Sequence, residues 1–175
     1  MQSINRKALT RISALILVMM LVFSFTASFA AESFSSSKAG VKYGGKTFKL
    51  NKSYSTSTMK KYVKKAFGSY ERKSGGACTC GSFFEYVTKK GITIETLQAK
   101  KGGKEKIITI TIKTKTVPTV SGLKVGNKVS KIANLYGKKC SKRGSTVKYT
   151  SGKHNMEVTT KSKKVTKIVF WYDFG

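Results

Sequence analysis

Residues 106–116 read KIITITIKTKT and carry the clearest strand pattern in the chain. Ile108, Ile110 and Ile112 alternate there with polar residues. Because successive side chains of a β-strand point to opposite faces, this strand has one apolar and one polar face. The stretch therefore predicts an antiparallel sheet that buries one face under helices and leaves the other to water or to a partner.

The chain before this strand predicts a short helix and further strands. From Ser57 to Phe67, apolar residues recur at the spacing of one helical face. Ser57 or Thr58 is expected to cap this helix, and Gly68 is expected to end it with a positive φ. An extended segment is expected before the helix, at about 47–54. Two strands are expected after it, at about 83–88 and 92–98.

The same order of elements recurs after Pro118, the only proline, which is expected to leave the sheet as a linker. Residues 122–137 read GLKVGNKVSKIANLYG, an extended segment followed by a short helix that Gly137 is expected to end. Strands are expected at about 145–150, 154–161 and 165–173. Aligning the two helix-ending glycines places Tyr86 and Tyr149 in corresponding strands, so the chain reads as an internal repeat.

We therefore predict an α+β fold of two tandem units, each a short helical element packed on an antiparallel sheet of about three to four strands, after a cleaved signal peptide. The expected divisions are a signal peptide at 1–30, a flexible Ser/Gly/Lys leader at 31–46, a first helix-plus-sheet repeat at 47–116 and a second one at 117–175.

The first thirty residues have the pattern of a secretory signal. Arg6, Lys7 and Arg11 precede an almost wholly apolar run, and Ser28 and Ala30 are small residues where signal peptidase cleaves. The pattern predicts cleavage after Ala30 and a protein that is extracellular or associated with the cell wall, with no stable membrane span. The alternative is an uncleaved anchor, because about 20 apolar residues can span a bilayer.

The composition is strongly cationic, with 35 Lys and Arg against 7 Asp and Glu and a formal net charge of +28. Lysine carries most of this charge, and its ammonium group lacks the planar fork that reads phosphate or guanine. We therefore expect diffuse attraction to an anionic envelope polymer or surface, such as teichoic acid, phospholipid headgroups or shed nucleic acid, and no specific nucleic-acid recognition. The alternative is a lysine bias in the composition of the source organism.

Cys78, Cys80 and Cys140 are the only cysteines. In an exported chain, three cysteines indicate one disulfide and one spare thiol. A bridge between Cys140 and one of the other two would join the two units. A direct bond between Cys78 and Cys80, free thiols and a three-thiolate metal site are the alternatives.

No combination of residues predicts catalysis. His154 is the only histidine, the seven acids are spread along the chain, and no glycine-rich phosphate loop is present. A nucleophilic pair of Cys140 and His154 has no orienting acid or amide at any motif spacing. Glu95 and Glu157 occupy corresponding strands, and each is expected to face a lysine across the sheet. We therefore predict a protein that is not an enzyme and that needs no cofactor or metal.

The repeated pattern resembles a known family. The glycine-bounded segment at 122–137 is followed by a Tyr strand, a Met-Glu strand and a closing KKVTKIVFWY strand. This order resembles the units of β-lactamase inhibitory protein-like domains. It also resembles the small barrel-assembly lipoproteins of Gram-negative outer membranes and, more closely, secreted proteins of unknown function from Gram-positive anaerobes. The resemblance covers nearly all of residues 45–174 and implies two sheets set side by side into a concave, non-enzymatic protein-binding face.

One part of that family's pattern is missing from this sequence. The known lactamase inhibitors use an acidic loop side chain to occupy the enzyme's substrate pocket. The corresponding loop here has Lys89, Lys90 and Gly91, with no acid nearby. The resemblance therefore does not extend to lactamase inhibition.

The candidate binding residues lie in the last strand and its surroundings. If the isoleucine and phenylalanine of that strand point to the core, then Val169 and the only tryptophan, Trp171, point to the open face. Together with Lys148 and Lys167 they form the candidate site, since tryptophan is common in binding hot spots. The alternative is that Trp171 packs across the seam between the two units.

These observations predict a secreted, non-catalytic binding protein that uses an open sheet face for a protein or envelope partner, with strong cationic attraction to anionic surfaces. The alternatives are a cationic envelope-associated protein that binds polyanions without a specific partner, and an inhibitor of a secreted or wall-associated enzyme. Salt separates the first two, because exposed charges are screened within about 10 Å at roughly 0.1 M ionic strength.

Overall fold

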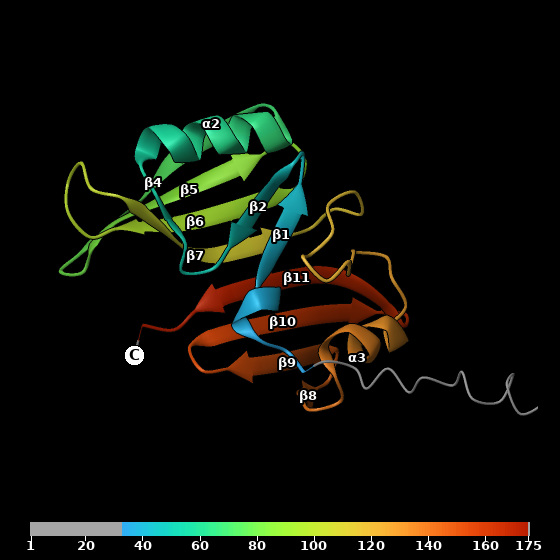
Figure 1. Cartoon of the computed structure of the whole chain (residues 1–175). Helices are drawn as coiled ribbons and strands as arrows, with labels where there is room; N and C mark the ends of the chain where they lie inside the picture. Colours follow the sequence, from blue (N-terminus) through green and yellow to red (C-terminus); the bar gives the residue numbers. More distant parts are fainter. Residues whose placement is uncertain (1–32, 175) are drawn as a thin grey trace, which may run out of the picture. The chain divides into compact units, whose positions relative to one another are not determined.

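The computed structural model describes residues 33–174, which contain one large antiparallel sheet (Figure 1). The strands of its first half are β3 (Ser53–Tyr54), β4 (Tyr70–Cys78), β5 (Gly81–Thr88), β6 (Ile92–Gln98) and β7 (Glu105–Ile112). The strands of its second half are β8 (Ser141–Arg143), β9 (Thr146–Ser151), β10 (His154–Lys161) and β11 (Lys164–Tyr172). A separate hairpin is formed by β1 (Gly40–Tyr43) and β2 (Lys46–Lys49). The helical segments are η1 (Ser36–Lys38), α2 (Thr56–Phe67) and α3 (Ser130–Tyr136).

Nine strands form the large sheet, in the order β4-β5-β6-β7-β11-β10-β9-β8, with β3 added against β7. The last strands of the two halves, β7 and β11, meet at its centre, where Ile112 lies opposite Ile168 and Ile110 lies opposite Phe170. The predicted α+β fold of two helix-on-sheet units is therefore wrong. The described chain is mostly β structure, with one continuous sheet in place of two separate ones.

The pairing of β7 with β11 has a simple physical cause. In two separate sheets, each of these strands would lie at an edge and expose a row of unpaired backbone N–H and C=O groups. Pairing them satisfies much of both rows and also aligns the apolar faces of the two halves. A period of two along the sequence shows that a strand exists, but it does not show which strand lies beside it.

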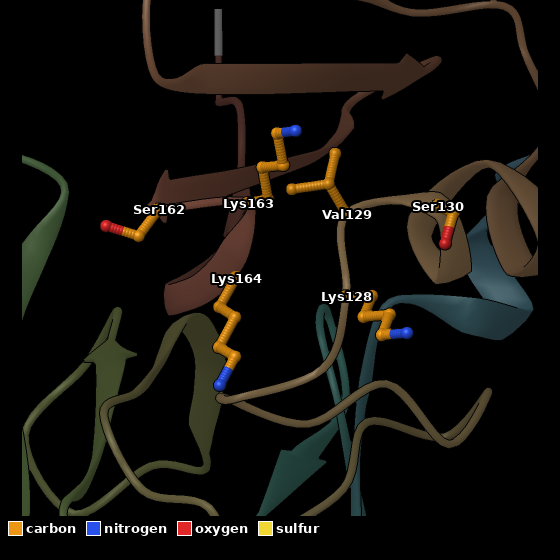
Figure 2. A pocket seen from close by; sticks show the side chains of 6 residues that line it. All are labelled: Lys128, Val129, Ser130, Ser162, Lys163 and Lys164. Atoms are coloured by element: carbon orange, nitrogen blue, oxygen red, sulfur yellow. The ribbon is translucent and has the colours of Figure 1, made fainter.

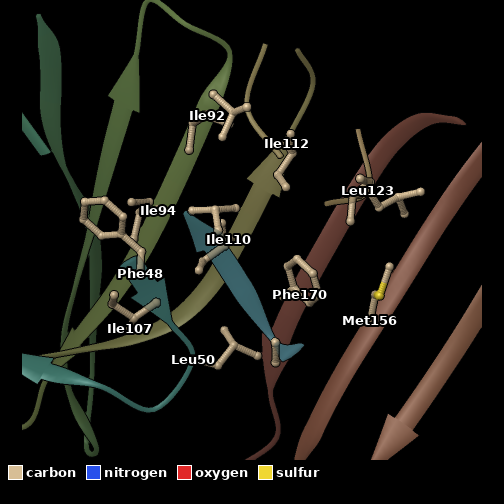
Figure 3. Packing of buried hydrophobic residues seen from close by; sticks show 14 of the residues in the cluster. Phe48, Leu50, Ile92, Ile94, Ile107, Ile110, Ile112, Leu123, Met156 and Phe170 are labelled. Carbon is tan, nitrogen blue, oxygen red and sulfur yellow. The ribbon is translucent and has the colours of Figure 1, made fainter. Parts of the chain in front are cut away.

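The core runs without a break across both halves of the sheet. One row of directly opposed residues, from β5 to β9, is Tyr86, Ile94, Ile110, Phe170, Met156 and Tyr149. All six side chains are buried. Figure 3 shows the middle of this row together with Phe48 of the β1–β2 hairpin, which packs into the same core.

Both helices end where the sequence predicts. Gly68 follows α2 with a φ of 79°, and Gly137 follows α3 with a φ of 83°, a conformation that favours glycine. The start of α2 is earlier than expected. Its cap is Ser55 rather than Ser57 or Thr58, and the Ser55 hydroxyl accepts a hydrogen bond from the Thr58 N–H at 3.2 Å.

The simple alternation predicted for β7 is wrong at its start, because the pairing of β6 with β7 contains a register shift. Glu95 lies opposite Thr109, whereas the next residue of β6, Thr96, lies opposite Ile107. Ile108 is therefore the extra residue of a β-bulge. Ile107 takes the place in the core that was predicted for Ile108, which is buried outside the core cluster.

The expected flexible leader at 31–46 is wrong where the structure describes it. The Phe34 ring packs against Tyr136 and Tyr149, with centroids 6.0 and 6.1 Å away, and Val41 of β1 is fully buried. The Ser, Gly and Lys residues around these side chains suggested a linker. Composition averaged over the segment concealed the few apolar residues that fix it to the core.

The segment around Pro118 leaves the sheet, as predicted, and lies along β1. The Lys42 N–H donates to the Pro118 carbonyl at 3.4 Å, and the Val120 N–H donates to the Gly40 carbonyl at 2.9 Å. The hairpin is thereby held to the connection between the two halves.

The expected signal peptide at 1–30 lies outside the described residues. Within residues 33–174, none of the helices has both the length and the apolar character needed to cross a membrane.

Candidate binding face

One face of the large sheet is left open. The helices α2 and α3 and the β1–β2 hairpin lie on the other face (Figure 1), and their buried side chains join those of the sheet in one core cluster. Residues that alternate with the core positions point away from the core, and we call this side the open face. Its members include Glu71, Lys73, Glu85, Val87, Thr93, Glu95, Thr109, Thr111, Lys148, Thr150, Asn155, Glu157, Lys167, Val169 and Trp171.

Strand β11 places Trp171 on the open face as the alternation predicts. Ile168 and Phe170 are fully buried in the core cluster, so Val169 and Trp171 point to the opposite side. Trp171 lies opposite Thr109 of β7. It therefore stands at the junction of the two halves, on the outer side of the sheet and partly exposed.

The remaining candidate residues lie on the same face. The Lys148 ammonium is 5.1 Å from the centroid of the Trp171 ring, a cation–π distance that contributes about 0.5–1 kcal/mol at exposed sites. Lys148 is also opposite Glu157, which is in turn opposite Val169. Lys167 lies opposite Thr159, two residues before Val169 along β11 and therefore on the same face.

The open face also carries most of the acids of the described chain, which the sequence did not reveal. Residues 33–174 contain 32 lysines and arginines against six acids, a formal charge of +26. Four of those six acids are on the open face, at Glu71, Glu85, Glu95 and Glu157. Because the acids are far apart along the chain, only the strand order shows that they share one surface.

Glu95 does not face a lysine, which corrects the prediction made for it, whereas Glu157 does face Lys148 as predicted. Glu95 lies opposite Glu85 on one side and Thr109 on the other. Burial raises the pKa of the Glu95 carboxyl, and the nearby Glu85 charge raises it further, against a hydrogen bond with Thr109 that lowers it. Two carboxylates placed directly opposite one another repel, so this part of the face favours a cation.

A second polar cluster is buried and has a structural role. The two Glu105 oxygens accept hydrogen bonds from Thr56 and Arg72, both at 2.8 Å, and from Tyr86 and Thr96, at 2.8 and 2.9 Å. Burial alone would raise the pKa of Glu105, but these hydrogen bonds outweigh it and lower the pKa. The carboxylate is inaccessible and fully partnered, so it is not available to a ligand.

The cysteines do not bridge the two halves. Cys78 is joined to Cys80 at the turn between β4 and β5, and Cys140 is free. The expected bridge that used Cys140 is therefore wrong. Cys140 instead lines a hollow beside α3 and contacts Tyr149, whose pKa is raised by burial and by the thiol.

The other sequence candidates form no reactive site. The His154 ring packs edge-on against Tyr172, with centroids 5.1 Å apart, and burial lowers the pKa of its imidazole. Cys140 and His154 thus face different neighbours. Among residues 33–174, no group of three or more His, Cys, Asp or Glu side chains is arranged to hold a metal ion.

Comparison with known proteins gives no family. No family model matches the chain, and no curated protein matches it. An extracellular protein containing a SCP domain from Bacillus anthracis str. Ames is a structural neighbour, with 10% sequence identity and a TM-score of 0.42. The match covers 73% of this chain and 49% of the other, so the chain spans about half the length of that protein.

Proposed function

We propose that the protein is a secreted, non-catalytic binding protein that is retained on anionic envelope polymers by its lysines and binds a protein partner through the open face. The observation that carries this proposal is the composition of the open face. It combines the only tryptophan with four of the six acids of a chain segment that is otherwise strongly cationic. A surface whose charge differs from its surroundings is suited to a partner that the rest of the molecule repels.

The chemistry of the open face indicates what that partner presents. Val169 and Trp171 offer partly exposed apolar surface at the centre of the sheet, and tryptophan is enriched in binding hot spots. Glu85 lies opposite Glu95 on one side and Lys73 on the other, and the Lys73 ammonium is 3.3 Å from Glu71. We expect the partner to place an apolar side chain against Trp171 and a basic side chain between the two glutamates.

Capture of envelope proteins from the producing organism tests the partner surface. The wild-type protein is expected to retain a defined protein at both 0.1 and 0.5 M NaCl, because an apolar contact is not screened by salt. Trp171→Ala is expected to lose that protein. Phe174→Ala removes an exposed ring outside the central strands and serves as the matched control, which is expected to keep that protein. Equal retention by wild type and Trp171→Ala would refute the proposed surface.

A second candidate function is adhesion to polyanions without any protein partner. The formal charge of +26 on residues 33–174 favours it. Exposed lysines attract a polyanion through charges that salt screens, so all retention on the envelope is expected to vanish at a few hundred millimolar salt. Retention that is lost with salt and unchanged by Trp171→Ala would support this function over the first.

A further inference from the structure

A hollow of about 560 Å³ lies between the start of α3 and the turn that joins β10 to β11 (Figure 2). It is lined by Lys128, Val129, Ser130, Ser162, Lys163 and Lys164. Half of these residues are lysines, two carry hydroxyl groups, and none is an acid. This hollow is separate from the open face described above.

Backbone pairing fixes the lysines around the hollow. Lys128 forms an isolated antiparallel bridge with Lys164, and the Val129 N–H donates to the Lys163 carbonyl at 3.1 Å. The Val165 N–H donates to the Asn127 carbonyl at 2.9 Å. The three lysines are therefore brought together by chain segments about 35 residues apart, and not by a local run of charge alone.

The lysines around the hollow have no counter-charge among its lining residues. Lys128 lies opposite Lys164 in the backbone bridge. No acid lines the hollow, so its charge is wholly positive and favours an anion.

The turn at the rim of the hollow has an unusual sequence for its conformation. Ser162 and Lys163 both have positive φ values, 51° and 59°, between the paired residues Lys161 and Lys164. A two-residue turn of this kind favours Asn and Gly, because other residues are strained there. The chain instead places a hydroxyl and an ammonium group at this position. Strained positions of this kind cluster at binding sites.

The ammonium groups are spread around the hollow and do not converge on one point. Figure 2 shows the Lys163 and Lys164 side chains pointing in opposite directions, with Lys128 directed to a third side. A single phosphate would meet only one of them. A chain with repeating negative charges would meet several in succession.

We infer that this hollow binds a phosphodiester-linked polymer without bases, as found in anionic cell-envelope polymers. This inference rests on the proposed function, in which lysines retain the protein on anionic envelope polymers. It assigns that retention to the lysines of the hollow. No aromatic or arginine side chain lines the hollow, so nothing there stacks on a nucleic-acid base. Val129 is the only apolar side chain that lines the hollow, and no aromatic side chain lies beside it there, so a lipid surface would find little to anchor it.

A pair of charge-matched variants tests the inference. Lys128→Gln/Lys163→Gln/Lys164→Gln removes the three lysines of the hollow, and all three are exposed. The control variant, Lys60→Gln/Lys61→Gln/Lys64→Gln, removes three exposed lysines from α2. The probe is a poly(glycerol phosphate) oligomer, and a thymidine oligonucleotide of equal charge and anionic phospholipid vesicles are measured beside it.

The hollow variant is expected to bind poly(glycerol phosphate) at least tenfold more weakly than the control variant does at 0.1 M salt. An equal loss in both variants would overturn the site while leaving diffuse cationic retention intact. An equally large selective loss on the oligonucleotide or on vesicles would overturn the polymer assignment. Failure of the wild-type protein to bind the polymer at low salt would overturn both the site and the proposed retention.

A second substitution tests the strained turn independently. Ser162→Asn/Lys163→Gly supplies residues that suit the two positive φ values. It is expected to raise the melting temperature by about 3 °C, while weakening binding of poly(glycerol phosphate) severalfold. A higher melting temperature with unchanged polymer binding would show that the turn has no part in the site. A lower melting temperature would show that the turn is not strained.

Discussion

Tyr86 and Tyr149 stand at the two ends of the same buried row of the sheet, yet their hydroxyl groups are satisfied in different ways. The Tyr86 hydroxyl donates to the Glu105 carboxylate at 2.8 Å and accepts from the Arg72 guanidinium at 3.1 Å. The Tyr149 hydroxyl donates to the Gly137 carbonyl at 2.9 Å. The first half of the sheet therefore uses a buried carboxylate paired with a partly buried guanidinium, where the second half uses a backbone carbonyl beside the Cys140 thiol.

This difference gives the two halves different sensitivities. Burial raises the pKa of both tyrosines, so both hydroxyls remain neutral donors. The carbonyl that Tyr149 uses cannot titrate, whereas the carboxylate that Tyr86 uses can. Breaking one partner of a buried charge pair leaves the other charge uncompensated. We therefore expect the first half to respond more strongly to substitution and to acid.

The largest effect is expected from Glu105→Gln. The substitution leaves the partly buried Arg72 guanidinium without its counter-charge, at 2.8 Å in the wild type, and is expected to lower the free energy of unfolding by about 3–5 kcal/mol. Glu71→Gln, which removes an exposed ion pair with Lys73, is the control and is expected to cost less than about 1 kcal/mol. Urea denaturation measures both, and similar losses would show that the buried pair has no special weight.

Acid is expected to remove the same stabilisation. The pKa of Glu105 is lower in the folded protein than its ordinary value, so its contribution is present above the unfolded pKa of about 4 and is lost as the pH falls through the folded pKa. Wild type should therefore lose stability faster than Glu105→Gln as the pH is lowered below about 4. Parallel curves for the two proteins would contradict the pKa shift.

The two tyrosines give a direct test of the comparison. Tyr86→Phe removes a hydrogen bond to a charged acceptor and is expected to cost about 1.5–3 kcal/mol. Tyr149→Phe removes a bond to a neutral carbonyl and is expected to cost about 1 kcal/mol. Thermal or urea unfolding of both variants measures the difference. A larger loss of unfolding free energy in Tyr149→Phe than in Tyr86→Phe would show that the first half of the sheet is not the more sensitive one.

The smallest effect is expected on the open face. Glu95→Gln removes the repulsion with Glu85 and is expected to raise the unfolding free energy at pH 7 by a few tenths of a kcal/mol. Because the pKa of Glu95 is raised in the folded protein, this gain should shrink as the pH falls through that pKa. Glu157→Gln, which faces Lys148, is the matched control and should have the opposite sign. Destabilisation by both substitutions would show that Glu85 and Glu95 do not repel.

The sequence predicted those features that depend only on residues close together in the chain. Gly68 and Gly137 ended their helices as predicted, because a positive φ favours glycine wherever the chain lies. The alternation in β11 placed Trp171 on the open face for the same kind of local reason. The same reasoning placed Ile108 wrongly in β7. A β-bulge is recognised only when the strand is compared with the strand it pairs with, which the sequence does not identify.

The sequence by itself determined strands β5, β6, β7, β9, β10 and β11, the two helix ends, the cationic composition and the side of the sheet that Trp171 occupies, but it missed β1, β4 and β8. Only the tertiary structure decided that β7 pairs with β11, that Cys78 bonds to Cys80, and that Glu105 is buried among hydrogen-bond donors. The physical reason is that periodicity and glycine conformation act over a few residues. Strand pairing, burial of a charge and the gathering of acids on one face depend on residues that meet only after folding.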